Sequence, residues 1–159
     1  MDMFCYQCEQ AANGKGCTAS GVCGKKPDVA ALQDLIVYQL KGISYFAHAA
    51  RRLGASDNTI NRFTIEALFT TVTNVNFDPE RLEDVLRTGN EMLKQAKALY
   101  ANSAHAKLTT PDQKLPEASL FEPAETTDEL IAQGVEVGIF SETKNEDIRS
   151  LEQLLIYGL

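Results

Sequence analysis

The chain has no cysteine after position 23, only two histidines among its 159 residues, and no long apolar run. A membrane-spanning helix needs about 20 consecutive apolar residues, so no membrane span is expected. Lysine and arginine number 15 against 22 acidic residues, and the net charge of −7 argues against a nucleic-acid partner. The first residues also lack the basic and apolar regions of a signal peptide. These absences predict a cytoplasmic protein.

All the cysteines lie close together at the start of the chain. Cys5, Cys8, Cys17 and Cys23 follow the spacing C-x2-C-x8-C-x5-C. Four thiolates on one short loop can converge on a single metal or iron–sulfur centre. A reducing compartment keeps thiols available for such a centre. We therefore predict that residues 1–27 form an irregular loop shaped around a cofactor.

The spacing alone leaves three kinds of site open: an iron–sulfur cluster, a zinc ion or two disulfides. A zinc ribbon has two close C-x2-C pairs, whereas here only the first pair has that spacing. Lys15, Lys25 and Lys26 lie beside the cysteines in a chain that is otherwise acidic. A four-thiolate cluster is anionic, so Lys15 and Lys25 would tune its charge. The spacing favours iron–sulfur, with zinc as the structural alternative.

Apolar residues recur at helical spacing after the loop and predict helices over about 28–53, 59–75 and 79–101. Asp28, Ser56 or Asp57, and Asp78 before Pro79 are the expected N-caps. Short links between three helices predict an all-α fold built on a three-helix bundle. Five positions are predicted to be buried in its core: Leu40, Ile43, Leu68, Leu86 and Leu93.

Residues 102–145 contain three prolines in a polar stretch and are predicted to be a linker, with one short helical turn over 128–133. The apolar run 135–140 is expected to pack on the bundle. Residues 146–159 predict an amphipathic helix, and 151–159 resemble 32–40. We interpret this helix as the first of a truncated second bundle, although chance similarity between two leucine-rich helices is the alternative. Its apolar stripe predicts self-association.

Four short stretches carry a resemblance to a known family: Met-Phe-Cys-Tyr-Gln-Cys-Glu-Gln over 3–10, Gly-Cys-Thr over 16–18, Gly-Val-Cys-Gly-Lys over 21–25, and Leu-Gln-Asp-Leu over 32–35. Their order and spacing resemble the N-terminus of the hybrid-cluster proteins, also called prismane proteins or hydroxylamine reductases. The match is specific over about 3–54, and looser helical similarity continues to the end.

The resemblance implies that Cys5, Cys8, Cys17 and Cys23 bind a [4Fe–4S] cluster. It implies that the complete protein reduces hydroxylamine to ammonia, nitric oxide, or both, at a second, hybrid iron–sulfur–oxygen cluster. In the family the ligands of that cluster are His, Glu and Cys residues of later domains, which this sequence lacks. No catalytic residue is therefore assigned here, and the expected partners are an electron-donating protein and the missing C-terminal domains or a complementary chain.

A second reading belongs to another class of protein, a zinc-stabilised helical interaction module without redox activity. The remaining candidate residues receive structural roles. We expect packing or surface positions for the two histidines, a helix-face charge for the carboxylate and core-edge positions for two of the tyrosines. The third tyrosine, between two cysteines, would cover the cluster or contact the bundle. These residues are His48, His105, Glu66, Tyr38, Tyr45 and Tyr6.

Overall fold

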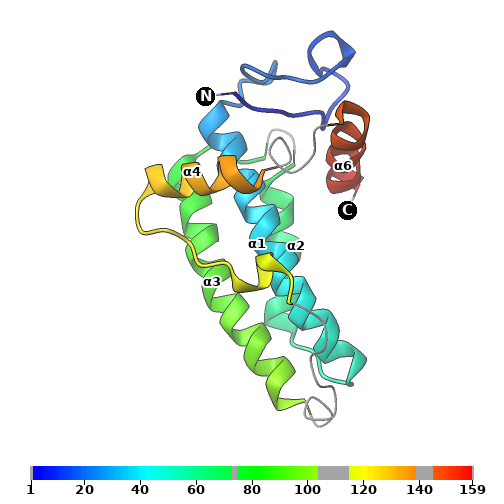
Figure 1. Ribbon diagram of the computed structural model, residues 1–159, viewed down its shortest axis with the longest axis vertical. Helices are drawn as coiled ribbons and strands as arrows, with labels where there is room; N and C mark the ends of the chain where they lie inside the picture. Colours follow the sequence, from blue (N-terminus) through cyan, green and yellow to red (C-terminus); the bar gives the residue numbers. More distant parts are fainter. Residues whose placement is uncertain (1, 73–74, 104–114, 139–144, 159) are drawn as a thin grey trace.

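The structure is a computed structural model that describes residues 2–72, 75–103, 115–138 and 145–158. In these ranges the chain forms helices and no β-strand, which confirms the predicted all-α class (Figure 1). The α-helices are α1 (Pro27–Arg52), α2 (Asn58–Thr70), α3 (Pro79–Asn102), α4 (Thr127–Val137) and α6 (Glu146–Gly158). Two short 3-10 helices, η1 (Ala12–Gly14) and η3 (Glu117–Leu120), complete the regular structure of the described ranges.

Helix α1 follows the cysteine loop directly. Its N-cap is Lys26 and not Asp28, because Pro27 takes the first helical position, where a missing N–H costs nothing. Asp28 instead lies in the first turn, where its negative charge suits the helix dipole. Arg51 and Arg52 occupy the last turn, where their positive charges suit the helix dipole. The helix therefore anchors one end of the loop.

Helix α2 begins as predicted and ends earlier than predicted. The Asp57 carboxylate caps it by accepting from two backbone N–H groups of the first turn. The helix ends at Thr70 and not near 75. The hydroxyls of Thr70 and Thr71 donate to carbonyls of the preceding turn, and β-branched residues favour the helix weakly. Helix α3 matches its predicted range within one residue, with Asp78 as its cap.

The core lies where α1, α2, α3 and α4 meet, and α1 is its central element (Figure 1). Four of the five predicted core residues, Leu40, Ile43, Leu86 and Leu93, are buried. Leu68 is only half-buried and packs at the edge of the same core. Leu68 therefore belongs to the core, as predicted, but is less buried than predicted.

The region predicted to be a linker contains a docked helix. Helix α4 extends well beyond the single turn expected over 128–133, and it crosses α1 (Figure 1). A reciprocal capping box between Thr126 and Glu129 starts it, and Leu130 is fully buried. The helix takes in the first part of the apolar run 135–140, whose last two residues lie outside the described ranges.

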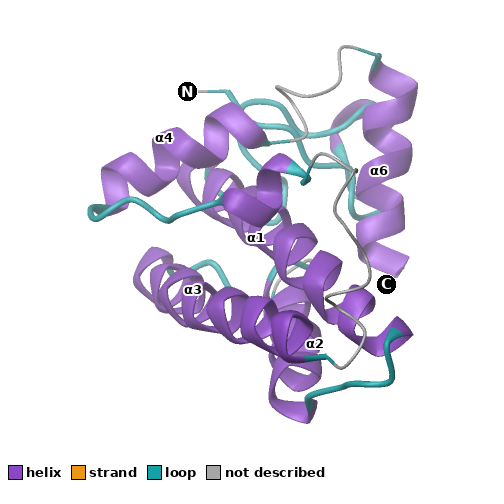
Figure 2. Ribbon diagram, turned by 60° about the horizontal axis from the view of Figure 1, so that its bottom comes forward, coloured by secondary structure: helices purple, strands orange, loops and turns teal. Residues whose placement is uncertain are grey.

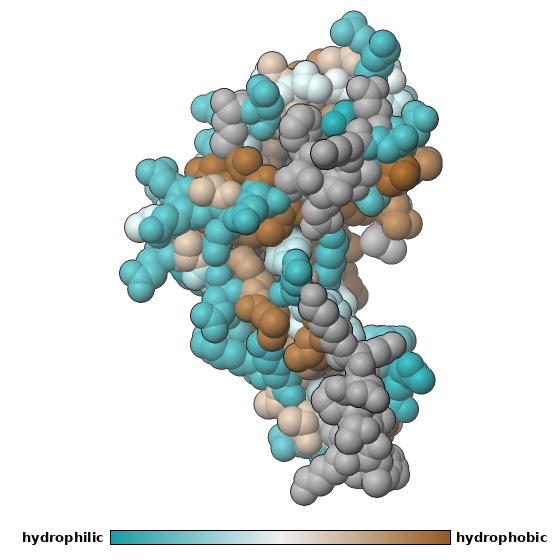
Figure 3. All heavy atoms as spheres, in the orientation of Figure 1, coloured by the Kyte–Doolittle hydropathy of each residue, from teal (hydrophilic) through white to brown (hydrophobic). Residues whose placement is uncertain are grey.

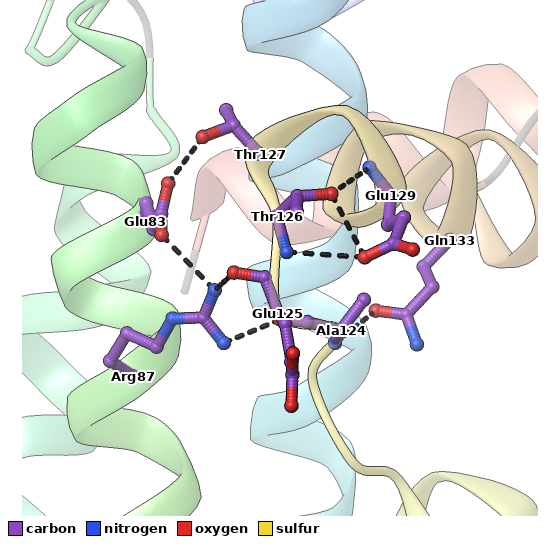
Figure 4. A network of polar contacts seen from close by, with 8 residues as sticks. All are labelled: Glu83, Arg87, Ala124, Glu125, Thr126, Thr127, Glu129 and Gln133. Carbon is purple, nitrogen blue, oxygen red and sulfur yellow. Dashed lines mark hydrogen bonds and ion pairs between the residues drawn. The ribbon is translucent and has the colours of Figure 1, made fainter.

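A polar network fixes α4 and the segment before it to α3 (Figure 4). The Thr127 hydroxyl donates to the Glu83 carboxylate at 2.6 Å. The Arg87 guanidinium donates to the carbonyls of Ala124 and Glu125 and pairs with Glu83 at 3.1 Å. The hydroxyl and the guanidinium hold the pKa of the Glu83 carboxyl below its usual range.

Helix α6 lies beside the cysteine loop (Figures 1 and 2). Several of its exposed side chains are apolar, and Leu151 is 65% exposed. Ile148, Leu154 and Leu155 are exposed as well, and brown atoms gather on this flank in Figure 3. Self-association through this stripe remains a prediction. Among the described helices, none combines the length and apolar character that crossing a bilayer requires.

Candidate cluster site

The cysteine loop is closed by a short antiparallel pairing of its two halves. The Cys5 N–H donates to the Cys17 carbonyl at 3.0 Å, and the Cys17 N–H donates back to the Cys5 carbonyl at 2.9 Å. The Met3 N–H extends the pairing to the Thr18 carbonyl at 2.9 Å. In Figure 1 this segment, drawn in blue, lies at the N-terminal end of α1. The pairing brings two of the four cysteines next to each other.

The four thiols differ in exposure. Cys17 is 5% exposed and packs with Met3 and with Ala30 of α1 in a small apolar cluster separate from the main core. Cys5, Cys8 and Cys23 are half-buried. Within the described ranges, no three His, Cys, Asp or Glu side chains form a group that could hold a metal ion. Convergence of all four sulfurs on one centre therefore remains a prediction.

Two glycines let the loop pack tightly. At Gly16, with φ of +114°, an added Cβ would stand 2.5 Å from the Phe4 ring, so a side chain would collide there and strain the backbone. At Gly21 a Cβ would stand 3.0 Å from Cys23 Sγ. The absence of a side chain at these two positions leaves room for the Phe4 ring and the Cys23 thiol.

A buried lysine lies beside the thiols. Lys25 is 3% exposed, and its Nζ lies 3.8 Å from Cys5 Sγ and 3.4 Å from Gln7 Oε1. The same Nζ lies 5.8 Å from the centre of the Phe77 ring. No carboxylate of the described residues pairs with this ammonium. Burying a cation is costly without an opposite charge, so its position suits an anionic centre formed by thiolates.

Electrostatics at Cys5 act in both directions. Burial raises the pKa of the Cys5 thiol, and the Lys25 ammonium and the Gln7 N–H offset part of that rise. Cys17 and Cys23 add a smaller effect that raises the same pKa, because a second negative charge nearby disfavours the thiolate. A thiol of this kind is protonated until a metal displaces its proton.

The other singled-out residues divide into loop contacts and helix positions. The Tyr6 hydroxyl donates to the Gly14 carbonyl at 3.2 Å and thereby braces the loop, while Lys15 is exposed. Glu66 is an exposed helix-face charge paired with Arg62, as predicted. His48 is exposed, and Tyr38 and Tyr45 each contact a neighbouring aromatic ring. His105 lies outside the described ranges.

Sequence reasoning missed three residues that shape the loop. Phe4 and Gln7 are buried in it, and Arg149 of α6 stacks on the Phe4 ring. Phe4 and Gln7 flank cysteines, which is the only signal that could have drawn attention to them. Nothing in the sequence connects Arg149 with the first residues of the chain.

The fold and the loop together define a helical domain that carries all its cysteines in one N-terminal loop beside a buried lysine. The profile of the Prismane/CO dehydrogenase family matches residues 3–159. The chain therefore belongs to this family, whose proteins bind iron–sulfur clusters.

Curated relatives agree with this assignment. The chain is 49% identical over 165 residues to a hydroxylamine reductase of Geobacter sulfurreducens, covering all of this chain and 29% of that protein. It is 46% identical over 158 residues to a hydroxylamine reductase of Thermosipho melanesiensis, covering 99% of this chain and 28% of that protein. A hydroxylamine reductase of Methanocella arvoryzae is 44% identical over 160 residues. The chain spans less than a third of the length of these relatives.

Proposed function

We propose that this chain is the N-terminal electron-transfer part of a hydroxylamine-reducing enzyme of the cytoplasm. In this proposal Cys5, Cys8, Cys17 and Cys23 hold a [4Fe–4S] cluster. The observation that carries it is the buried Lys25 ammonium, which lies against a thiol and has no carboxylate partner among the described residues. Four thiolates bound to one cluster would supply the missing negative charge.

The residues of the loop would each contribute in a defined way. When bound, such a cluster takes up and releases single electrons. Lys25 balances negative charge at Cys5, and the pairing of Cys5 with Cys17 fixes the backbone of two ligands. Met3 and Ala30, packed around Cys17, exclude water from that side. The exposed Lys15 would add a weaker positive charge, because water screens it.

Hydroxylamine reduction itself belongs to the longer protein. Conversion of hydroxylamine to ammonia and water consumes two electrons and two protons, so an electron donor and a path for single electrons are both needed. The loop would provide part of that path, and a redox partner protein would supply the electrons. The centre that reduces hydroxylamine, nitric oxide, or both, would be built from residues beyond this chain. We therefore expect no turnover of hydroxylamine by this chain alone.

The test is anaerobic purification followed by metal and acid-labile sulfide analysis. The proposal expects about four iron and four sulfide per chain, with a thiolate-to-iron absorption near about 400 nm. One zinc per chain without sulfide would refute it and favour the interaction module. About two iron and two sulfide would refute the cluster type alone.

Cys8 gives the sharpest variant, because no described contact joins it to the other three cysteines. Cys8→Ser should lower the bound iron or abolish the absorption, whereas Ser20→Ala, on the same loop, should leave both unchanged. Full iron and an unchanged spectrum in Cys8→Ser would remove Cys8 from the ligand set.

A further inference from the structure

We propose that Arg149 of α6 is a positioning residue for the cysteine loop and that it acts through Phe4. The guanidinium carbon lies 3.8 Å from the centre of the Phe4 ring. This is well inside the limit of about 6 Å for a cation–π contact. Phe4 is 4% exposed, so water barely screens the ring. The part of this inference that concerns a cluster rests on the proposed function, and the part that concerns the loop does not.

The Phe4 ring connects α6 to both halves of the loop. Phe4 stands between Met3 and Cys5, whose N–H groups donate to the other half of the loop. Its ring packs on Gly16, where no Cβ could fit. Gly16 precedes Cys17, so a ring held in place by Arg149 keeps the two paired segments in contact.

A second contact shows that α6 lies along the loop and does not merely touch it. Ile156 lines a small cavity together with Phe4, Cys5 and Lys25. Arg149 and Ile156 are seven residues apart, which places them on one face of the helix. The views in Figures 1 and 2 agree that α6 lies beside the N-terminal segment. One face of α6 therefore serves the loop.

The consequence concerns the most protected thiol. Cys17 is buried behind the pairing of 3–5 with 17–18. Reagents reach it only when this pairing opens locally. Loss of the Arg149 contact removes one of the forces that keep the pairing closed. Cys17 should then become accessible more often, while Cys23, which lies outside the pairing, should change little.

The experiment measures alkylation of each cysteine in the reduced, metal-free chain by pulsed iodoacetamide and mass spectrometry. Arg149→Ala should speed labelling of Cys17 about tenfold, the factor that corresponds to a desolvated cation–π contact. Arg149→Lys keeps the cation and loses the planar stack, so it should give an intermediate rate. Arg52→Ala, at the far end of α1, removes the same charge and should change the rate less than about twofold.

A second background tests whether Arg149 acts through the ring. In Phe4→Leu, adding Arg149→Ala should change the Cys17 rate by less than about twofold, because no ring is left to stack on. An unchanged Cys17 rate in the single Arg149→Ala variant would overturn the proposal. Equal acceleration of all four cysteines, or a loss of helical circular dichroism, would overturn it as well, because the contact is assigned to the loop and not to the helices.

Failure of this inference and failure of the proposed function are separable. The labelling uses the metal-free chain, so its result does not depend on whether iron binds. In a reconstituted chain, Arg149→Ala should also lose its absorption near about 400 nm faster than Arg52→Ala when a chelator is added. Equal loss in the two variants would refute the link to the cluster and leave the loop contact in place.

Discussion

Replacing Gly134 of α4 by alanine tests whether this helix is docked on α1. The sign of the resulting change in the free energy of unfolding decides the question. A Cβ at this position would stand 2.1 Å from the backbone carbonyl oxygen of Ala31 in α1 and 2.6 Å from the carbonyl carbon. Ordinary carbon contacts begin near about 3.5 Å, so α4 would have to move by roughly 1 Å. The obstacle is helix backbone, which cannot rotate away as a side chain can.

Two opposing effects set the magnitude. Alanine is favoured over glycine in a helix interior by about 1 kcal/mol. Overpacking a tight contact costs about 1–3 kcal/mol, and displacement of α4 would also loosen the buried Leu130. We expect the overpacking to outweigh the helix preference, so that Gly134→Ala lowers the free energy of unfolding by about 1 kcal/mol net.

The assay is urea unfolding followed by circular dichroism at the helix band. Gly158→Ala is the matched control, because a Cβ there meets nothing within 4 Å. If α4 were an undocked helix in a linker, Gly134→Ala would stabilise the protein or leave it unchanged. Either outcome would refute the docking of α4 against α1.

Three further predictions concern the core, the polar network and the loop. Leu86→Ala should cost about 2–5 kcal/mol in urea unfolding, because its side chain is fully buried, and a loss below about 0.5 kcal/mol would contradict that position. The Glu83 carboxyl has a lowered pKa in the folded state, so its contribution is present above its unfolded pKa of about 4.3 and is lost as the pH falls through the folded value. Glu83→Gln should therefore be less stable than the parent by about 1 kcal/mol at neutral pH, with the gap closing below about pH 4, and a gap independent of pH would count against this reasoning. Lys25→Met removes a buried positive charge beside Cys5 and should lower the reduction potential of the proposed cluster in spectroelectrochemical titration, whereas the exposed Lys41→Met should not; equal potentials would speak against a role for Lys25.

Local sequence signals predicted the existence and most of the boundaries of the first three helices. Asp57 and Asp78 cap α2 and α3 as predicted, and apolar spacing placed most of the core correctly. The end of α2 was missed because the apolar pattern continues past Thr70, where β-branched residues outweigh it. Asp28 has the side chain of a good cap, but Pro27 prefers the first helical position and shifts the cap to Lys26.

Helix α4 was missed although a local signal was present. Prolines before it suggested a linker, yet Thr126 and Glu129 have the spacing of a capping box. Its docking could not be predicted, because it depends on Gly134 meeting the backbone of α1 from a distant part of the sequence.

The cysteine loop divides in the same way. Spacing singled out Cys5 and its three companions, and the ligand set stays a prediction. The burial of Lys25 could not be foreseen, because lysine is almost never buried and its place depends on the folded loop. The stack of Arg149 on Phe4 joins opposite ends of the chain, and no local pattern encodes such a contact.

The apolar cluster beneath Cys17 is separate from the core of the helices, and this separation bears on how the protein matures. Met3 and Cys17 are not part of the helical core, so the helices can fold while the loop is still open. Opening of a small cluster requires less free energy than global unfolding. If the proposed cluster binds here, a newly made chain would present its thiols to an iron–sulfur donor from folded helices, and a cluster damaged by oxygen would be replaced without unfolding them.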